Sequence, residues 1–558
     1  MSPAALPAKI RSTMCGILGM IGERWAADFE PALDCMAHRG PDDRGVWDQP
    51  DHHVRLGHRR LSIIDLSPAG HQPMTTPDGR HTIIFNGEIY NFPELREQLA
   101  GLGRAFRSHC DTEVLLEAYA QWGLDALKRL DGMFAFAIWD REQRTLIAAR
   151  DRFGIKPLFY STADGLIVSS TMSPYWKLSG FPRSVDYRGL RDYLASQSVP
   201  APRTILRHVH AVEPGQYLIY HADDGRVELD HYWTIPEPTD SPLSPADLVE
   251  ATDAAMQASV SRQMISDVPL GAFPSGGIDS SLLVAYMAEA SSQPLKTFSV
   301  RFPQTRGYDE SPYAKQVADA FGCVHHVLDA EAIDADRLAA GIDMLDQPLA
   351  DPAYLAAKNL SQLCRDHVTV AISGEGGDEV FGGYPRFLQD ESHWPNGPGQ
   401  RLLHRLIEMR VAPGGLWRRA LGGRERLLWE RVKVGPWPGS RKALADLLHD
   451  RAADAAEIDQ TMDKWRALLD RFGPVADTDA LMRADLWTYL TDNNLTKADR
   501  ASMAFGLEVR VPMLGNDVVD LVLGQPAEAK LDGRLKAVLQ ELSSRRLPRE
   551  GWDRPKHG

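Results

Sequence analysis

The residues best suited to chemistry begin at Cys15, which follows Met14 in the stretch RSTMCGILGMIG. As part of an apolar run, Cys15 could be a small buried residue at the edge of a first strand, since free cysteine is among the most buried residue types. If the chain were cut after Met14, Cys15 would carry a thiol and an α-amine together. An α-amine has a pKa near ~8, so its neutral form can take a proton from the thiol. This alternative predicts a self-contained nucleophile and base.

A loop rich in glycine and hydroxyl groups lies in GAFPSGGIDSSLLVAYMA. Ser275, Gly276 and Gly277 follow a short apolar strand, and Asp279 and Ser280 fall in the first turn of an expected helix. Glycines let the backbone approach an anion closely, and free N–H groups at a helix start favour negative charge. A Walker loop is absent, and a plain turn capped by Asp279 or Ser280 is the alternative. The SGG-x-DSS pattern favours a pyrophosphate-binding loop.

A second loop of this kind, VAISGEGGDEVFGGY, follows the next strong strand signal. Ser373 and Gly374 could pass close to a nucleotide, and Glu375 is flanked by glycines. Magnesium bound to a polyphosphate takes one or two protein carboxylates, and Asp279 and Asp378 are the expected pair. The alternative is an exposed acidic turn that closes on the following glycine pair.

The elements that must position these residues differ between the two parts of the chain. From Cys15 to about residue 235, short apolar runs such as GMFAFAIWD and RTLIAARD alternate with turn signals, and helices are expected at about 91–101 and 111–123. This pattern predicts an α+β module rich in antiparallel sheet. The proline-rich stretch TIPEPTDSPLSP, residues 234–245, is typical of a linker.

Beyond the linker, strand, loop and helix signals alternate through DVPLGAF, KTFSVRF, VHHVLD and HVTVAISG. That alternation predicts a parallel sheet covered by helices, with ligands at the carboxyl ends of the strands. Residues from about 395 to 545 are expected to be mainly helical.

Length and charge exclude several classes of protein. The chain has 558 residues and a formal net charge of −14, which predicts two to four domains and argues against a nucleic acid partner. No apolar run approaches the ~18 residues of a membrane helix, and the first fourteen residues lack the apolar middle of a secretion signal. We therefore expect a cytoplasmic protein without membrane attachment. Five scattered cysteines predict neither disulfides nor structural zinc.

Taken together, the motifs resemble a known family. Cys15-Gly16-Ile17, HRGPDD, GHRRLSIIDLSPAGHQPM, FNGEIYN, DGMFAFAIWD and ARDRFGIKPLFY resemble the class II glutamine amidotransferase domain. PSGGIDSS, SGEGGDEVFGGY, KADRASM and LEVRVP are similar to the synthetase domain of glutamine-hydrolysing asparagine synthetases. The resemblance implies a four-layer αββα sandwich of the Ntn-hydrolase type, then an α/β parallel-sheet domain of the ATP-pyrophosphatase type with a largely helical C-terminal part. The implied boundaries are 1–14 for a leader or mis-assigned start, 15–233, a linker at 234–245, and 246–558.

The resemblance implies roles for residues of the first domain. Cys15 is the nucleophile, exposed by removal of the residue before it, and Asn86 and Gly87 supply the oxyanion hole. Arg60 pairs with the substrate carboxylate and Asp111 accepts from its ammonium group. Without the resemblance, Asn-Gly is also the strongest short signal for a hairpin turn. The implied glutamine-binding residues are Arg60, Leu61, Ser62, Ile63, Ile64, Asn86, Gly87, Glu88 and Asp111.

In the second domain, the resemblance implies an ATP site and two catalytic residues. Glu375 corresponds to a proposed base for the attack of ammonia, and Lys536, in DGRLKAVLQE, to a lysine that neutralises the leaving pyrophosphate. From the residues alone, a lysine on a helix face is more often merely solvated. The implied ATP-binding residues are Phe273, Ser275, Gly276, Gly277, Asp279, Ser280, Val300, Ser373 and Gly374, with Mg²⁺ held by Asp279 and Asp378.

The implied reaction is ATP-dependent synthesis of an amide. Cys15 releases ammonia from glutamine, and the second domain joins a carboxylate to AMP for ammonia to displace; with aspartate as acceptor the product is asparagine. The expected partners are glutamine, ATP and aspartate or another small carboxylate, and a homodimer is compatible with the resemblance.

Three features depart from the family pattern. Pro274 precedes the SGG, SSTMSP at 169–174 replaces the usual SSExKA, and the chain stops at RPKHG, where relatives continue. Two alternatives therefore stay open. One is an enzyme of the same family with another carboxylate acceptor, and the other is a synthetase-defective glutaminase or binding protein.

Overall fold

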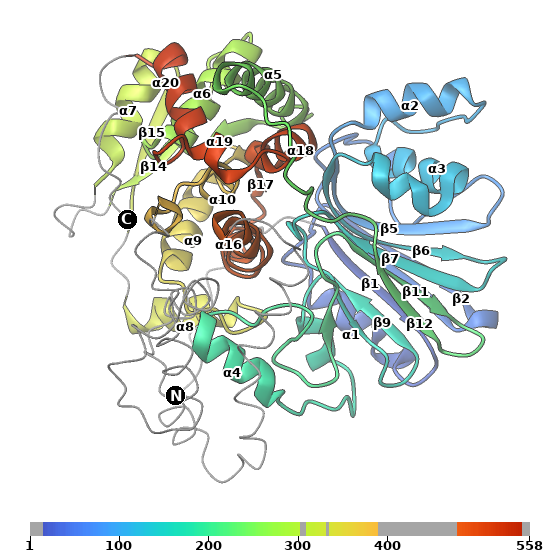
Figure 1. Ribbon diagram of the computed structural model, residues 1–558. Coiled ribbons are helices and arrows are strands. Elements are labelled where there is room, and N and C mark those ends of the chain that lie inside the picture. Colours follow the sequence, from blue (N-terminus) through green and yellow to red (C-terminus); the bar gives the residue numbers. More distant parts are fainter. Residues whose placement is uncertain (1–14, 302–308, 331–333, 389–476, 549–558) are drawn as a thin grey trace, which may run out of the picture.

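The computed structural model describes residues 15–301, 309–330, 334–388 and 477–548 (Figure 1). Residues 1–14, predicted to be a leader or a mis-assigned start, lie outside these ranges, as do the helices predicted between 395 and 476 and the chain end at RPKHG. Among the helices that the structure describes, none has the length and apolar character needed to span a membrane.

Two six-stranded antiparallel sheets stack face to face in the N-terminal half (Figure 1). Their strand orders are β10-β8-β9-β1-β3-β2 and β12-β11-β7-β6-β5-β4. The first sheet comprises β1 (Gly16–Ile21), β2 (Asp43–Gln49), β3 (Val54–Arg60), β8 (Phe159–Ser161), β9 (Leu166–Ser169) and β10 (His210–Ala211). The second comprises β4 (Met74–Thr75), β5 (His81–Ile89), β6 (Gly132–Asp140), β7 (Thr145–Arg150), β11 (Gln216–His221) and β12 (Val227–His231).

Alternating side chains of the strands build separate cores on the two faces of each sheet. In β5, Ile83 and Phe85 pack toward the helices on the outer face, whereas Ile84 belongs to the core between the sheets. Helices α2 (Phe92–Gly101) and α3 (Asp111–Trp122) cover the second sheet, and α1 (Phe29–Asp34) covers the first. A further helix, α4 (Tyr187–Ser196), lies between β9 and β10 in the chain. The predicted four-layer αββα sandwich is confirmed, and α2 and α3 match the two predicted helices.

The segment predicted to be a linker is fixed against the second half. Between β12 and α5 (Pro245–Gln263), Ile235 is buried in the core of the C-terminal half. The Thr239 N–H donates to the Gly524 carbonyl at 2.8 Å, and the Leu243 N–H donates to the Gln525 side chain at 2.9 Å. These contacts hold the connection in one conformation on the surface of the second half.

A five-stranded parallel sheet, in the order β15-β14-β13-β16-β17, forms the centre of the C-terminal half. This confirms the predicted parallel sheet, although β17 lies in a region expected to be mainly helical. The strands are β13 (Leu270–Ala272), β14 (Lys296–Arg301), β15 (Val324–Asp329), β16 (Val370–Ile372) and β17 (Glu508–Arg510). The helices after α5 are α6 (Ile278–Ala290), α7 (Ser311–Ala320), α8 (Ala335–Asp343), α9 (Ala353–Cys364), α10 (Gly377–Phe381), α16 (Asp477–Asp485), α17 (Thr496–Met503), α18 (Asn516–Leu523), α19 (Ala527–Leu531) and α20 (Ala537–Arg546), with a π-helix at Leu486–Leu495.

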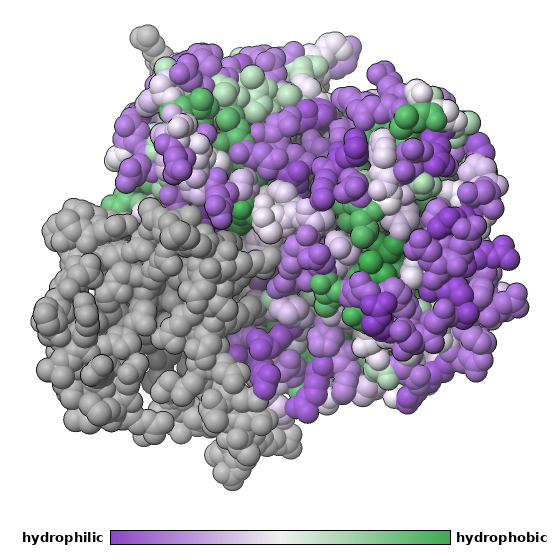
Figure 2. All heavy atoms as spheres, turned by 45° about the vertical axis from the view of Figure 1, so that its right-hand side comes forward, coloured by the Kyte–Doolittle hydropathy of each residue, from purple (hydrophilic) through white to green (hydrophobic). Residues whose placement is uncertain are grey.

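The two halves meet through buried contacts. Arg39 pairs with Asp499 of α17, with 3.3 Å between Nη1 and Oδ2, and both side chains are almost fully buried. Leu61 and Ile63 pack with Val370 of β16 across the same boundary. The described residues on the face shown in Figure 2, in contrast, are largely hydrophilic, with apolar patches between them. The buried Arg39–Asp499 pair and the apolar contacts of Leu61 and Ile63 therefore exclude solvent from the boundary between the two halves.

Candidate active sites

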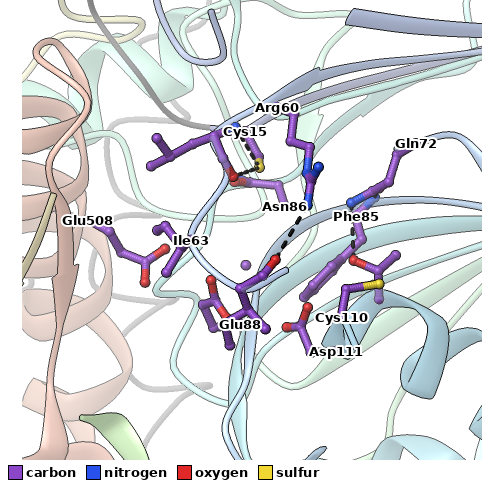
Figure 3. A pocket seen from close by; sticks show the side chains of 14 residues that line it. Cys15, Arg60, Ile63, Gln72, Phe85, Asn86, Glu88, Cys110, Asp111 and Glu508 are labelled. Atoms are coloured by element: carbon purple, nitrogen blue, oxygen red, sulfur yellow. Dashed lines mark hydrogen bonds between the residues drawn. The ribbon is translucent and has the colours of Figure 1, made fainter. Parts of the chain in front are cut away.

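A pocket at the domain boundary contains the predicted nucleophile (Figure 3). It lies where β1, β3 and β5 of the sandwich face strand β17 of the parallel sheet. Of the predicted glutamine-binding residues, Ser62 alone does not line it; the Ser62 N–H donates instead to the Asp42 carboxylate at 3.0 Å. The lining residues are Cys15, Arg60, Leu61, Ile63, Ile64, Gln72, Phe85, Asn86, Gly87, Glu88, Cys110, Asp111, Thr112 and Glu508.

Cys15 stands immediately before β1, with its thiol against the Leu61 backbone. Its Sγ accepts from the Leu61 N–H at 3.4 Å and lies 3.7 Å from the Leu61 carbonyl oxygen, while the Arg39 Nε donates to the Cys15 carbonyl at 3.2 Å. Burial raises the pKa of the Cys15 thiol to about 12. Because the thiol stays protonated at neutral pH, a nucleophilic attack needs a base that takes the proton.

Asn86 and Gly87 lie inside strand β5, opposite Ala135 and Phe134 of β6. Gly87 has a φ of +151°, and a Cβ there would lie 2.0 Å from the Met133 carbonyl oxygen. The prediction of a hairpin turn at the Asn-Gly pair is therefore wrong. The glycine instead allows the neighbouring strand β6 to approach closely. The Asn86 side chain is fully buried, and its Nδ2 lies 3.5 Å from Ser170 Oγ. A fixed amide beside Cys15 suits an oxyanion hole.

Backbone carbonyls hold Arg60 at the pocket wall. Its guanidinium donates to the carbonyl oxygens of Asp65 at 2.6 Å and Ser67 at 3.2 Å. A Cβ at Gly70 would lie 2.0 Å from Arg60 Nη2, so only glycine leaves room for this arrangement. The cation is buried and fixed at the pocket, where it can meet a carboxylate.

Buried carboxylates occupy another part of the pocket. Asp111 accepts from the Ile89 N–H at 2.9 Å, and burial raises its pKa to about 6. Burial, together with repulsion from Asp111 and Glu508, holds the pKa of Glu88 well above its usual range. These groups are poorly neutralised within the protein and are suited to receive an ammonium group.

In the C-terminal half, the first glycine-rich loop joins β13 to α6. Helix α6 begins after Gly277 without a side-chain cap, so neither Asp279 nor Ser280 acts as the cap considered above. Ser280 Oγ instead accepts from the Ser275 N–H at 3.0 Å. Gly276 has a φ of +74°, and a Cβ there would lie 2.4 Å from Tyr313 Cβ. The glycine lets the loop backbone pack closely, and no side chain caps the N–H groups at the start of α6. These free N–H groups are suited to bind an anion.

The second loop packs against the first. A Cβ at Gly374 would lie 3.3 Å from Asp279 Cβ, and one at Gly377 would lie 2.9 Å from Asp279 Cγ. The Ser373 hydroxyl donates to the Glu375 carboxylate at the end of β16. Val300 lies in β14, and Phe273 directly follows β13, the neighbouring strand of the same sheet. The predicted nucleotide residues therefore come from neighbouring strands and loops.

Lys536 joins the carboxylates of the two loops. Its Nζ lies 2.5 Å from Asp279 Oδ2 and 2.6 Å from Asp378 Oδ1, and the two carboxylates raise its pKa. A Cβ at Gly383 would lie 1.9 Å from Asp378 Oδ1 and 2.3 Å from Lys536 Cε. The lysine is thus neither on an open helix face nor merely solvated, and Asp378 is not part of an exposed turn.

Sequence reasoning gave no role to several residues of these sites. Gln72 supports the pocket of Cys15, since its side chain accepts from the Phe85 N–H at 2.7 Å and donates to Thr112 at 3.2 Å. Glu508 reaches the pocket from the other domain. Gln72 lies in SPAGHQPM and Glu508 in LEVRVP, two of the motifs that resemble the family. These motifs were the sequence signals from which both residues could have been predicted.

A cysteine pocket that faces a parallel sheet with two glycine-rich loops defines a two-domain glutamine amidotransferase. The family models that match are a glutamine amidotransferase domain over residues 14–233 and asparagine synthase over residues 251–558. The chain is 36% identical to glutamine-hydrolyzing asparagine synthetase 1 of Bacillus subtilis (strain 168), over 98% of this chain and 86% of that protein. It therefore belongs to the glutamine-hydrolysing asparagine synthetase family.

A further curated relative agrees with this membership. A putative glutamine-hydrolyzing asparagine synthetase of Mycobacterium bovis is 35% identical over 98% of this chain and 87% of that protein. Among solved structures, glutamine phosphoribosylpyrophosphate amidotransferase from B. subtilis aligns at 16% identity and a TM-score of 0.31, over 66% of this chain and 77% of that chain.

Proposed function

We propose that this protein makes asparagine from aspartate, with ATP as the activating substrate and glutamine as the nitrogen donor. The observation that carries the proposal is the position of Cys15. The cysteine packs on an apolar cluster that contains Leu61 and Ile63 of its own domain and Val370 of β16. Strand β16 ends at Ile372, directly before the nucleotide loop at Ser373. One cluster thus contacts the nitrogen-releasing site and the sheet that carries the activating site.

In the first reaction, Cys15 Sγ attacks the amide carbon of glutamine while its proton passes to a base. The α-amine of Cys15 is the proposed base once residues 1–14 are removed. Asn86 Nδ2 and the Gly87 N–H would stabilise the negative oxygen, and loss of one such donor typically costs ~3 kcal/mol of transition-state stabilisation. The carbon–nitrogen bond breaks, ammonia leaves, and water then cleaves the thioester to glutamate and the free thiol.

In the second reaction, a carboxylate oxygen of aspartate attacks the α-phosphorus of ATP and pyrophosphate leaves. The open start of α6 and the Ser275–Ser280 loop would bind the phosphates, and Lys536 would neutralise the pyrophosphate. Ammonia then attacks the acyl carbon, AMP leaves, and Glu375 would take the excess proton. A small pocket between the domains is lined by apolar residues such as Leu495, Val509 and Val511, together with the charged pair Lys156 and Asp499. Its apolar part would favour neutral ammonia over ammonium.

Mg²⁺ fits the pair Asp279 and Asp378. Asp279 Oδ1 is buried and has no hydrogen-bond partner among the residues that the structure describes, so it can act as a ligand. When bound there with ATP, the ion would reduce the negative charge of the polyphosphate.

The proposed function is tested with purified protein, glutamine, aspartate, ATP and Mg²⁺. We expect asparagine, glutamate, AMP and pyrophosphate in equal amounts. Release of glutamate without AMP or pyrophosphate would show a defective synthetase half. AMP release with another carboxylate but not with aspartate would assign a different acceptor within the family.

The proposed leader is tested separately by intact mass and N-terminal sequencing of active protein. We expect the chain to begin at Cys15. Full glutamine-dependent activity with residues 1–14 still attached would contradict the role of the α-amine.

A further inference from the structure

The glutamine pocket is completed by a residue of the other domain. Glu508 belongs to β17, at the edge of the parallel sheet, yet its side chain lines the pocket of Cys15 and Asp111 (Figure 3). It is only 2% exposed. A carboxylate that is buried against a substrate pocket requires a charge partner there.

The charges around Glu508 do not balance within the pocket. Glu508 Oε1 accepts from Arg510 Nε at 2.7 Å, while Arg510 Nη2 stays 3.7 Å from Glu88 Oε1. Glu88 Oε2 is buried without a hydrogen-bond partner among the described residues. Lys156 adds a weaker attraction on Glu88, but repulsion from Asp111 and Glu508 exceeds it. One more cation would neutralise this group, and the α-ammonium of glutamine is such a cation.

Arg510 is held in place and cannot move closer to Glu88 to neutralise it. Its Nη1 donates to the carbonyl oxygens of Gln263 and Ile265, each at 2.7 Å, at the end of α5 and just beyond it. The backbone of Arg510 is fixed as well, because its carbonyl accepts from the Ser373 N–H at 2.9 Å. Strand β17 therefore contacts the glutamine pocket through the Glu508 side chain and the nucleotide loop through the Arg510 backbone.

We propose that Glu508 is a positioning residue for glutamine, supplied by the synthetase domain, and that β17 makes glutamine affinity depend on the bound nucleotide. The inference rests on the function proposed above for both sites. Glu508 acts by fixing Arg510 and adding negative charge beside Glu88, so that the ammonium group is bound in one orientation. The Ser373 N–H of the nucleotide loop donates to the Arg510 carbonyl of the same strand. ATP at the nucleotide loop and glutamine at the pocket would therefore both act on the position of β17, which couples their affinities.

The test compares wild type with Glu508→Gln, which keeps the oxygen that accepts from Arg510 but removes the charge. Glutaminase activity is measured with and without ATP, and AMP formation is measured with saturating ammonium. We expect the variant to raise the KM for glutamine about tenfold while kcat changes less than about twofold. In wild type, ATP should lower the KM for glutamine by about fivefold, and the variant should lose that shift. Ammonium-dependent AMP formation should stay unchanged.

Two further variants separate positioning from folding. Glu508→Asp restores the carboxylate and should recover most of the affinity. Glu117→Gln removes a buried glutamate of α3 that pairs with Arg104 at 3.1 Å outside the pocket, and its KM should match wild type. An unchanged KM in Glu508→Gln, or an equal loss of all activities with no recovery in Glu508→Asp, would overturn the proposal. Because the KM for glutamine is measured without synthesis, failure of wild type to form AMP would refute the proposed function without deciding this question.

Discussion

The two sites of the molecule prepare for their substrates in opposite ways. In the glutamine pocket, burial raises the pKa values of Glu88 and Asp111, and repulsion from neighbouring carboxylates adds to this effect at Glu88. In the synthetase site, Lys536 already bridges Asp279 and Asp378. The first site therefore gains a missing charge when its substrate binds, whereas the second must exchange charge partners. Nitrogen release should depend on filling a pocket, and acid activation on rearranging ion pairs.

The largest difference between the activities of the two sites should come from Cys15→Ala. Without the thiol no thioester forms, so glutamine-dependent asparagine synthesis should fall by about a thousandfold or more. Synthesis from added ammonium should stay within about twofold of wild type, because the other half does not use the thiol. Assays of AMP and asparagine with each nitrogen donor check this, and loss of both activities would show that the halves are not chemically separable.

The converse change is Lys536→Met, which removes the cation between the two loops. AMP formation should fall about a hundredfold with either nitrogen donor, because the charge on the pyrophosphate is no longer neutralised. Glutaminase activity without ATP should be unchanged. Lys530→Met is a matched control, since Lys530 is also a buried lysine beside a carboxylate, 3.5 Å from Asp479; we expect it to retain AMP formation. A normal rate of AMP formation in Lys536→Met would remove the lysine from the mechanism.

The boundary between the sites is tested by Arg39→Met. The change leaves the buried Asp499 with weaker compensation from Lys156 and Arg500, so the free energy of unfolding should fall by about 3 kcal/mol. It also removes the bond to the Cys15 carbonyl, and we expect more than one glutamate released per asparagine. Urea unfolding and product ratios measure these effects. Arg24→Met, which breaks an exposed pair with Asp164, should change stability by less than about 1 kcal/mol.

The smallest expected effect is the pH dependence of glutamine binding. Burial raises the pKa of Asp111 to about 6, and in the proposed site the ammonium group of glutamine binds the ionised form. Affinity is therefore present above pH 6 and is lost as the pH falls through that value. The KM for glutamine should rise about fourfold between pH 7.5 and 5.5. Asp111→Asn should bind more weakly and lose most of this dependence; a variant with the wild-type pH profile would assign the titration to another group.

Much of the fold could be predicted because local patterns and tertiary structure agree. The alternating apolar runs of the first half became strands of two stacked sheets, and the strand-loop-helix alternation became a parallel sheet. The Asn86-Gly87 pair shows where local signals fail. Its turn propensity was overridden by pairing of β5 with β6 over residues on both sides. Strand β17 is three residues long, too short for periodicity to indicate.

The candidate sites could be predicted only in part, for a related reason. Motifs indicated Cys15, Asp279 and Asp378, but no spacing in the sequence predicts that Lys536 lies between two carboxylates more than 150 residues away. Glu508 was missed because its contact with the glutamine pocket exists only where the two domains pack together. Residues that act across a domain boundary carry no local signal of their partners.

The transfer of nitrogen between the two sites can be measured directly with glutamine labelled by ¹⁵N in its amide. The labelled glutamine is supplied with aspartate, ATP, Mg²⁺ and a moderate excess of unlabelled ammonium, and the asparagine formed is analysed by mass spectrometry. We predict that most of the asparagine carries ¹⁵N, with one AMP formed per asparagine, as the proposed passage of ammonia between the packed domains requires. Asparagine whose label is diluted to the level of the surrounding ammonium would contradict a joined pair of sites.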